Sequence, residues 1–357
     1  MLLTLVSFIV VLGIVIFIHE LGHFLAARLS GARVEVFSIG FPPKMVGFQR
    51  GDTEYRIGWI PLGGYVKIAG MIDESLDGEE TLTGAPDEFM SKSYPQKVFM
   101  LSAGVIMNFL LGFLLYSFIA FTEGKPVADP SAVIGSVVQG YPAQEAGLQA
   151  GDRIIALDGN QIHTWDELTS VVHPRPADTL DVTWVRAADT LSATVVTRAD
   201  EVSIDGTAET RGMIGIGPDF QREPVGFFEA FAHGGETTGR IVVLTLQMFG
   251  RLFTGQASID ELTGPVGIVH LSGETARAGW ATFLSFIALI NISIGLLNIM
   301  PFPVLDGGHI VFVTLEAILR RQISTRVKVI VQQVGMVLLL LLMVVVTYND
   351  ILRFFMG

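Results

Sequence analysis

Four long runs without a charged residue constrain this chain most strongly. They cover positions 2–18, 98–122, 280–305 and 329–349 of the 357 residues. A helix needs about 20 apolar residues to cross the hydrocarbon of a bilayer. The last three runs exceed that length, and the first reaches it if its helix continues beyond position 18. The sequence therefore predicts a polytopic α-helical membrane protein with about four transmembrane helices.

The composition changes between these runs, which divides the chain into eight expected segments. Segment 28–96 is rich in β-forming residues and glycine, and its stretch 71–90 is acidic and poor in large apolar side chains, so no structure is expected there. The segments are 1–27 (first transmembrane helix), 28–96 (membrane-associated β-loop and acidic linker), 97–122 (second helix), 123–220 (a soluble α+β domain), 221–279 (amphipathic surface helices, about 225–233 and 237–253), 280–309 (third helix), 310–326 (a connection) and 327–357 (fourth helix and C-terminus).

Basic residues predict the orientation in the membrane, because loops rich in Lys and Arg stay in the cytoplasm. Eight basic residues gather near one set of helix ends, and only Lys125, Arg277 and Arg353 lie near the other. We therefore expect both termini and segment 123–220 on the extracytoplasmic side of the membrane. The eight residues are Arg28, Arg33, Lys92, Lys97, Arg320, Arg321, Arg326 and Lys328.

The overall charge also limits the partners. The net charge is −12, which argues against a nucleic acid as a partner. The four apolar runs make the lipid bilayer an expected partner. Cysteine is absent, so neither a disulfide nor a thiolate metal site can form.

The first apolar run ends in the motif His19-Glu20-Leu21-Gly22-His23. Residues four apart lie on one face of a helix, so the two imidazoles can bind one metal ion. Glu20 can then act as the general base that takes a proton from water. Ionisable side chains at membrane depth are costly and are usually functional. The motif therefore predicts a catalytic metal site near the cytoplasmic end of the first helix.

A second cluster of polar residues lies at the same predicted depth, at the end of the third helix. Catalytic zinc takes three protein ligands and keeps one position open. Asp306 can supply the third ligand, and His309, one turn further along, is the alternative. Asn298 lies before two prolines that break the helix, where its amide can hydrogen-bond a substrate backbone or an oxyanion. One Zn²⁺ per chain is the expected cofactor.

Segment 123–220 contains a series of short motifs that resembles a PDZ domain: V-x-x-V, P-A-x-x-A-G-L, G-D-x-I and L-D-G-N-x-I. The resemblance implies one PDZ domain, which either binds a peptide or C-terminus by adding a strand or acts as a steric filter. In the circularly permuted bacterial type, the carboxylate-binding loop comes last in the domain. It would then comprise Gly212, Met213, Ile214 and Gly215.

Taken together, the chain resembles the site-2 protease family, in its bacterial branch of regulator of sigma-E proteases. The resemblance rests on H-E-L-G-H in the first helix, N-x-x-P-x-P-x-L-D-G in the third, and a PDZ domain between helices two and three. It implies an intramembrane zinc metalloprotease of the bacterial inner membrane that cuts the transmembrane segment of its substrate after a first cleavage elsewhere. The substrate would be, for example, an anti-sigma factor or a remnant signal peptide. The resemblance also implies His19, His23 and Asp306 as ligands, Glu20 as the catalytic residue, Asn298 as a substrate-positioning residue, and an edge strand around Gly64 and Tyr65 that holds the unwound substrate.

Two other functions fit parts of the pattern. A membrane-anchored PDZ adaptor or chaperone would keep the metal site without catalysis. An ion carrier would need polar residues throughout the membrane depth, whereas here they cluster at one end. Loss of activity in Glu20→Gln with zinc retained separates the protease from both.

Overall fold

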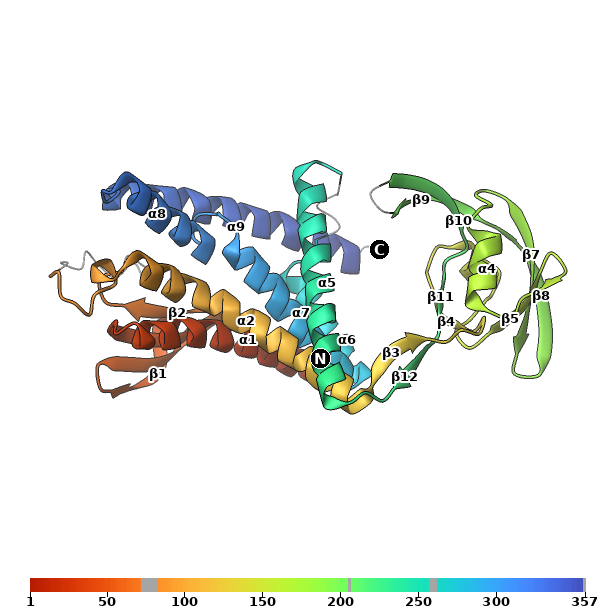
Figure 1. Cartoon of the computed structure of the whole chain (residues 1–357), viewed down its shortest axis with the longest axis horizontal. Helices are drawn as coiled ribbons and strands as arrows, with labels where there is room; N and C mark the ends of the chain where they lie inside the picture. The colour runs from red at the N-terminus through yellow and green to blue at the C-terminus, as the bar shows by residue number, and fades with distance from the viewer. Residues whose placement is uncertain (72–82, 205–206, 257–261, 356–357) are drawn as a thin grey trace. The chain divides into compact units, whose positions relative to one another are not determined.

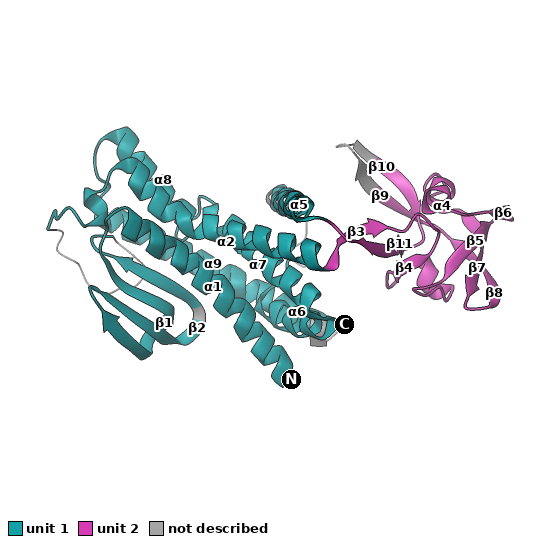
Figure 2. Cartoon of the chain, turned by 60° about the horizontal axis from the view of Figure 1, so that its bottom comes forward, with its two compact units in different colours: residues 1–122, 226–357 teal, residues 123–225 magenta. Residues whose placement is uncertain are grey.

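The computed structural model describes residues 1–71, 83–204, 207–256 and 262–355. It divides into two compact units: unit 1 comprises residues 1–122 and 226–357, and unit 2 comprises residues 123–225 (Figure 2).

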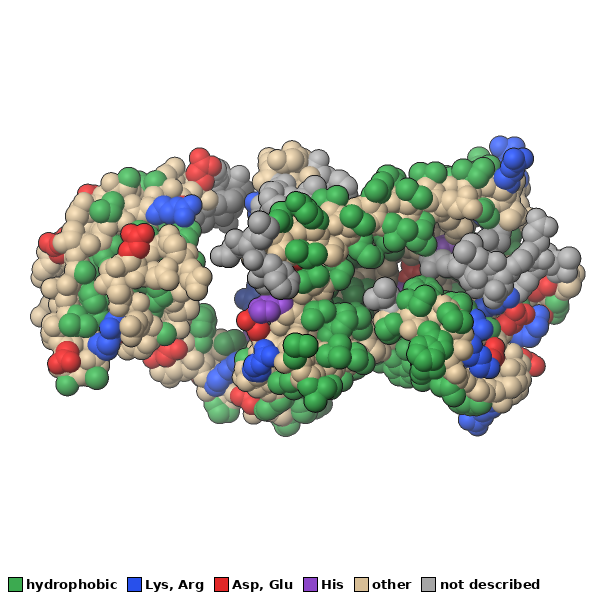
Figure 3. Space-filling view, turned by 180° about the vertical axis from the view of Figure 1, so that it is seen from behind, with side chains coloured by type: hydrophobic (Ala, Val, Ile, Leu, Met, Phe, Trp, Pro, Cys, Tyr) green, Lys and Arg blue, Asp and Glu red, His purple; other side chains and the backbone are tan. Residues whose placement is uncertain are grey.

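Four helices of unit 1 are long and apolar enough to cross a membrane: α1 (Leu2–Leu29), α2 (Tyr94–Glu123), α7 (Trp280–Ile299) and α9 (Thr325–Phe355, apolar to Arg353). Their predicted number is confirmed. Hydrophobic side chains gather over the helices of unit 1 on the face shown in Figure 3. Outward-facing apolar side chains such as Leu341 and Val344 on α9 are stable only in an apolar solvent.

The third apolar run does not continue as one helix. α7 ends at Ile299, and a second helix, α8 (Asp306–Leu319), begins after the proline-containing turn. The predicted break at Pro301 and Pro303 is present, but the prediction that 310–326 is only a connection is wrong, because α8 fills most of it. Asp306 therefore occupies the first turn of a helix, where the helix dipole stabilises a carboxylate.

The segment before α7 also differs from its prediction. We expected two helices, about 225–233 and 237–253, whereas α5 is one helix from Phe227 to Phe253. The helix continues through Gly234. This glycine allows α5 to lie close to α2, since a Cβ there would lie 2.1 Å from Oγ of Ser117. α5 runs across the direction of α1, α2, α7 and α9 (Figure 1).

A further helix, α6 (Pro265–Ala278), was not predicted as a separate element. It is not a surface helix: its Ser272 is fully buried, and its Gly273 lies against Thr4 of α1. Asp350 of α9 is 2% exposed and accepts hydrogen bonds from the backbone N–H groups of Gly264 (3.1 Å) and Gly267 (2.8 Å) at the start of α6. This buried carboxylate in the fourth helix was not predicted.

The predicted β-loop is a sheet beside α1, formed by β1 (Val34–Arg50) and β2 (Thr53–Ile68) (Figure 1). β2 folds back on β1, so residues 36–41 pair with residues 54–60 on one side, and residues 34–39 pair with residues 64–68 on the other. A tight turn at Gly51 and Asp52 joins the two strands. Residues 64–68 therefore form an edge, since the described residues give them no second strand partner.

Part of the acidic linker has structure, contrary to the prediction for 71–90; its residues 72–82 lie outside the described residues. Phe89 is buried in the cluster around α1 and α2 and begins a short 3₁₀ helix, η1 (Phe89–Ser91). The Glu88 carboxylate accepts hydrogen bonds from the backbone N–H groups of Thr83 and Gly84. These contacts explain why an acidic sequence is ordered there.

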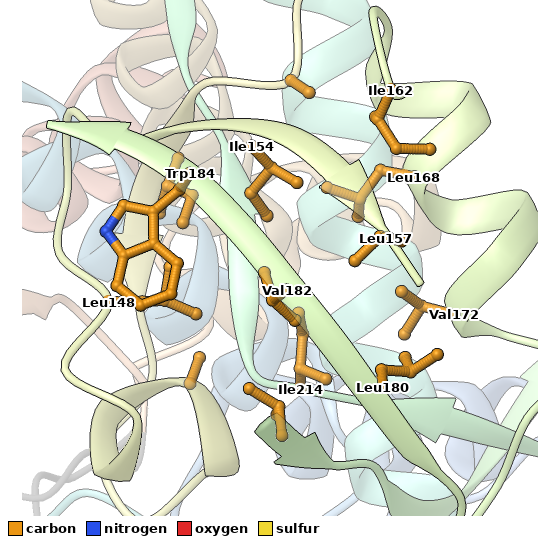
Figure 4. Close-up of a cluster of buried hydrophobic side chains, with 14 residues drawn as sticks. Leu148, Ile154, Leu157, Ile162, Leu168, Val172, Leu180, Val182, Trp184 and Ile214 are labelled. Atoms are coloured by element: carbon orange, nitrogen blue, oxygen red, sulfur yellow. The ribbon is translucent and has the colours of Figure 1, made fainter. Parts of the chain in front are cut away.

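Unit 2 is an α+β fold with a four-stranded antiparallel sheet in the order β6-β5-β7-β8. Its core is a cluster of buried side chains around Trp184, Leu157 and Ile154 (Figure 4). A capping box opens α4, because the side chains of Thr164 and Glu167 each accept a hydrogen bond from the other residue's backbone N–H. The elements are β3 (Lys125–Ala128), β4 (Ile134–Val137), α3 (Pro142–Glu145), β5 (Arg153–Leu157), β6 (Asn160–Gln161), α4 (Trp165–Val172), β7 (Thr179–Arg186), β8 (Asp189–Val196), β9 (Arg198–Ile204), β10 (Thr207–Met213), β11 (Ile216–Pro218) and β12 (Phe220–Glu223).

The predicted carboxylate-binding loop connects β10 to β11. Gly212 donates its N–H to the carbonyl of His173, and the carbonyls of Ile214 and Gly215 accept hydrogen bonds from other backbone N–H groups. Gly215 has φ +80°, and a Cβ there would collide with the ring of Tyr141. Met213 ends β10. Backbone hydrogen bonds to neighbouring segments thus hold the loop in place. Its use as a ligand site stays a prediction.

One ion pair should make the stability of unit 2 depend on pH. Asp152 is 1% exposed, and both of its carboxylate oxygens accept hydrogen bonds from Arg186 (2.7 and 2.8 Å). The hydrogen bond from Arg186 holds the pKa of Asp152 below its usual value. A lowered folded-state pKa stabilises above the unfolded pKa, about 3.9, and this stabilisation is lost as the pH falls further.

We expect Asp152→Asn to destabilise unit 2 by about 2–3 kcal/mol at pH 7. Hydrogen exchange at β5 and β7 in the full-length chain would measure this. The difference from the parent chain should shrink below about pH 4. Asp189→Asn, on the exposed turn into β8, is the control and should exchange like the parent chain. Equal hydrogen exchange in Asp152→Asn and Asp189→Asn would contradict a stabilising role of the Asp152–Arg186 pair.

Candidate metal centre

Two glycines bring α1 and α2 together at the H-E-x-x-H motif. A Cβ on Gly22 would lie 2.3 Å from the carbonyl oxygen of Ala103, and one on Gly104 would lie 2.3 Å from Nε2 of His23 and 2.9 Å from Nδ1 of His19. Small residues allow this close approach of helices. The motif therefore lies directly against the backbone of α2.

The structure brings three of the predicted residues to one point. His19 and His23 lie one helical turn apart on α1, and Asp306 comes from the first turn of α8. Their candidate ligand atoms are close: Nε2 of His19 is 3.2 Å from Nε2 of His23, and Oδ2 of Asp306 is 3.2 and 3.4 Å from these two nitrogens. The side chains of His19 and Asp306 are 12% and 16% exposed.

These separations fit a zinc ion. Tetrahedral zinc with ligands at about 2.0–2.2 Å holds its ligand atoms roughly 3.3–3.6 Å apart. Oδ2 of Asp306 is buried and accepts no hydrogen bond from any described residue, although two imidazoles lie beside it. Two imidazoles and one carboxylate form a donor set that catalytic zinc takes.

α2 also supplies polar partners for both imidazoles. Nδ1 of His23 lies 2.8 Å from the carbonyl oxygen of Met100, and Nδ1 of His19 lies 3.2 Å from the amide Nδ2 of Asn108. Met100, Gly104 and Asn108 are four residues apart, so they share one face of α2. A carbonyl that accepts Nδ1–H leaves the Nε2 lone pair of that ring available to a metal.

The alternative third ligand lies elsewhere. Nε2 of His309 is 3.4 Å from the amide of Gln332 on α9, and His309 is not among the three grouped ligand atoms. The amide Nδ2 of Asn298, at the end of α7, lies 3.3 Å from Nε2 of His19 and therefore at the site.

The remaining predicted residues lie beside the motif. Glu20 is 8% exposed, and a Cβ on Gly64 would lie 2.9 Å from its Cγ, so the edge strand of the sheet passes directly against it. Tyr65 is buried, with its ring parallel to Phe41 and the Arg56 guanidinium 5.0 Å from its centre.

Sequence reasoning did not assign the partners from α2. Asn108 is a fully buried polar residue in an otherwise apolar run. Its spacing of four from Gly104 was the available signal. The carbonyl of Met100 could not have been found from sequence, since any residue carries one.

Gly104→Ala should disrupt this centre, because the added methyl would occupy the position of the His23 imidazole. We expect at least about 10-fold weaker zinc binding, comparable to the loss of a supporting contact in other zinc sites. Competition with a chromogenic chelator on purified protein would measure it. Gly13→Ala, on α1 with nothing within 4 Å of the added Cβ, is the matched control. Unchanged zinc affinity in Gly104→Ala would show that the close approach of α1 and α2 does not hold the two histidines in place.

Comparison with known proteins identifies the family of this chain. The profile of Peptidase family M50 matches residues 7–342. A protein of Rhizobium meliloti is 36% identical over 98% of this chain and 96% of its own length. Proteins named zinc metalloprotease RasP are 31% identical in Oceanobacillus iheyensis, over 99% of this chain and all of theirs, and 30% identical in Geobacillus kaustophilus, over 99% of each.

Among solved structures, the PDZ domain of an SdrC-like protein from Listeria monocytogenes is 26% identical over 26% of this chain and 90% of its own, with a TM-score of 0.21. The predicted family is confirmed by the match across nearly the whole sequence. This chain belongs to peptidase family M50, and it is a metalloprotease.

Proposed function

We propose that this protein hydrolyses peptide bonds within the transmembrane segments of single-span membrane proteins, after a first cleavage has trimmed the substrate. Zinc is its metal, one ion per chain. The observation that carries the proposal is the grouping of His19, His23 and Asp306 beside Glu20 at the ends of helices that are apolar enough to span a membrane.

Each residue of the site has a distinct task in this proposal. His19, His23 and Asp306 would hold zinc, which lowers the pKa of water and polarises a carbonyl when it is bound. Glu20 takes the proton from the attacking water and passes it to the leaving amine. The Asn298 amide, 3.3 Å from His19, donates to the substrate carbonyl oxygen where negative charge develops.

The edge of the sheet suits an unwound substrate. A helical peptide bond is shielded by its own hydrogen bonds, so cleavage needs a locally extended chain. Residues 64–68 form an edge that can pair with such a chain, and Gly64 lies against Glu20. A substrate strand held there would pass close to the general base. Buried Tyr65 fixes the edge against the rest of the sheet.

The position in the membrane follows from the charge pattern. We infer that both termini and unit 2 are extracytoplasmic and that the site lies near the cytoplasmic face of the inner membrane. The transverse direction of α5 supports a helix that lies on the membrane surface (Figure 1). Unit 2 is a PDZ domain that either binds a peptide end at Gly212–Gly215 or excludes untrimmed substrates.

Cleavage of a single-span peptide by purified protein in detergent tests the proposal. Products within the span, lost on chelation and restored by zinc, would support it. An adaptor or ion carrier would bind zinc without producing fragments. If the loaded protein cuts only soluble loops and never the span, the intramembrane assignment is wrong.

Asn108 supports this function through His19. An amide presents its oxygen where its nitrogen stood after half a turn, and the two atoms are assigned from the hydrogen-bond network. With Oδ1 toward the ring, Asn108 accepts Nδ1–H of His19 and leaves Nε2 for the metal. We expect Asn108→Leu to weaken zinc binding about 10–100-fold, whereas Asn108→Asp keeps an acceptor and binds near the parent level.

A second buried asparagine provides the control for this prediction. Asn291 on α7 is also fully buried, and its amide donates to the carbonyl of Ile287 in its own helix. Asn291→Leu removes a buried amide without touching the histidines, so its zinc affinity should stay at the parent level. Equal losses in the two Leu variants would mean that Asn108 acts only through packing.

A further inference from the structure

An open cleft lies between the start of α2 and the turn from α8 to α9. Its volume is about 260 Å³, several times the roughly 30 Å³ that one water molecule takes in the liquid. The polar lining includes Lys97 of α2 together with Glu316, Arg320 and Arg321. The proposed catalytic centre does not use any of these residues. Basic side chains stand out at this turn in Figure 3.

The lining carries an excess of positive charge. Its acidic residue, Glu316, is engaged elsewhere: its Oε1 lies 2.8 Å from Nζ of Lys328 and accepts the backbone N–H of Ile323 at 2.8 Å. Arg320 and Arg321 make no ion pair within the described residues, and both are exposed. The cleft therefore presents two guanidinium groups and an ammonium group that can bind a phosphate.

The backbone at Arg320 also points to a use for its side chain. Arg320 ends α8 with φ 53° and ψ 30°, the left-handed conformation that glycine usually supplies at this position. A residue with a side chain is strained there. A ligand of the guanidinium would offset the conformational strain of placing arginine where glycine is favoured.

Part of the cleft's lining is apolar. Met90, Val313 and Ala317 lie among its polar residues. Tyr94 lines the cleft at the start of α2, a helix apolar enough to span the membrane, where aromatic residues favour the headgroup level. A ligand that matches both surfaces carries a phosphate at one end and hydrocarbon at the other.

We propose that this cleft binds the phosphate headgroup of an anionic phospholipid, with the acyl chains leaving along its apolar lining. Basic pockets between membrane helices recognise anionic headgroups by this combination of charge and depth. The site would tie the α8–α9 turn to the membrane surface. Because α8 also carries Asp306 in its first turn, a lipid here contacts the helix that completes the proposed metal site.

Native mass spectrometry of the full-length protein in detergent tests this, with phosphatidylglycerol, phosphatidylcholine and inorganic phosphate as separate ligands. We expect phosphatidylglycerol to bind at least about 5-fold more tightly than phosphatidylcholine. Arg320→Gly combined with Arg321→Gln should weaken phosphatidylglycerol binding about 30-fold, because each basic residue near the membrane surface contributes about 5-fold. Glycine suits the backbone at position 320, so this variant should fold.

The control removes two charges outside the cleft, in Arg50→Gln combined with Arg326→Gln. Both residues are exposed and come from segments rich in basic residues, so general electrostatic attraction changes equally. A similar loss in the control would overturn the cleft as a site. Displacement of phosphatidylglycerol by millimolar inorganic phosphate would overturn a lipid as the occupant and assign the cleft to free phosphate.

Discussion

Glu20→Gln is expected to lower the rate of peptide cleavage by about 10²–10⁴-fold while the purified protein keeps its zinc. The amide has the shape of the carboxylate but cannot take a proton from water, and general-base catalysis typically contributes a factor of this size. Glu20 is not one of the three grouped ligand residues, so its replacement should leave the metal in place. Cleavage of a labelled single-span peptide, with zinc determined on the same preparation, measures both quantities.

The comparison needs a second glutamate variant. Glu54→Gln, on β2, removes a partly exposed carboxylate that pairs with Lys44. It should leave the rate within about 2-fold, because such pairs near the surface contribute little. If Glu20→Gln keeps most of its activity, another residue is the base. If it loses zinc as well as activity, Glu20 acts on the metal site itself, and its assignment as general base fails.

The second large effect concerns the metal. Asp306→Asn should remove most of the bound zinc, because the amide oxygen is a much weaker ligand than the carboxylate, and because the carboxylate lies within 3.4 Å of both imidazoles. We expect the zinc affinity to fall by more than about 100-fold, beyond the range seen for supporting residues. Chelator competition on the purified chain measures this without relying on activity.

His309→Asn is the matched variant on the same helix. The two residues are the sequence's alternatives for the third ligand, and the His309 ring lies beside Gln332 instead of the other two ligands. Zinc affinity should therefore stay near the parent value in His309→Asn. The reverse pattern would make His309 the ligand and require α8 to rotate when metal binds.

The sequence predicts those features of the fold that are encoded within one short segment. The uncharged runs, the helix break at Pro301 and the capping box of Thr164 and Glu167 follow from single segments. The grouping of Asp306 with the two histidines was expected from topology, because both motifs lie at the same end of their helices. The structure brings these residues within one site.

Tertiary contacts decided what the sequence could not. We expected separate helices on the two sides of Gly234, but this glycine lies within one helix and is a point of close contact with Ser117. The segment before η1 was expected to be without structure because it is acidic, yet Glu88 satisfies its own neighbouring backbone. In each case the local propensity is weak, and the deciding partner lies on another element or in a turn that composition does not reveal.

The contact between Asp350 and the start of α6 has a consequence for the order in which the protein matures during synthesis. The carboxylate that accepts the N–H of Gly264 lies 86 residues later in the chain. At about 5–20 residues per second, the ribosome needs roughly 4–17 s to add that length. The earlier helices can enter the membrane and pack in this interval. Until Asp350 is made, the N–H of Gly264 lacks this hydrogen-bond acceptor. Completion of unit 1 is therefore tied to the arrival of α9, and a ribosome that stalls between the two elements would leave this helix start without its cap.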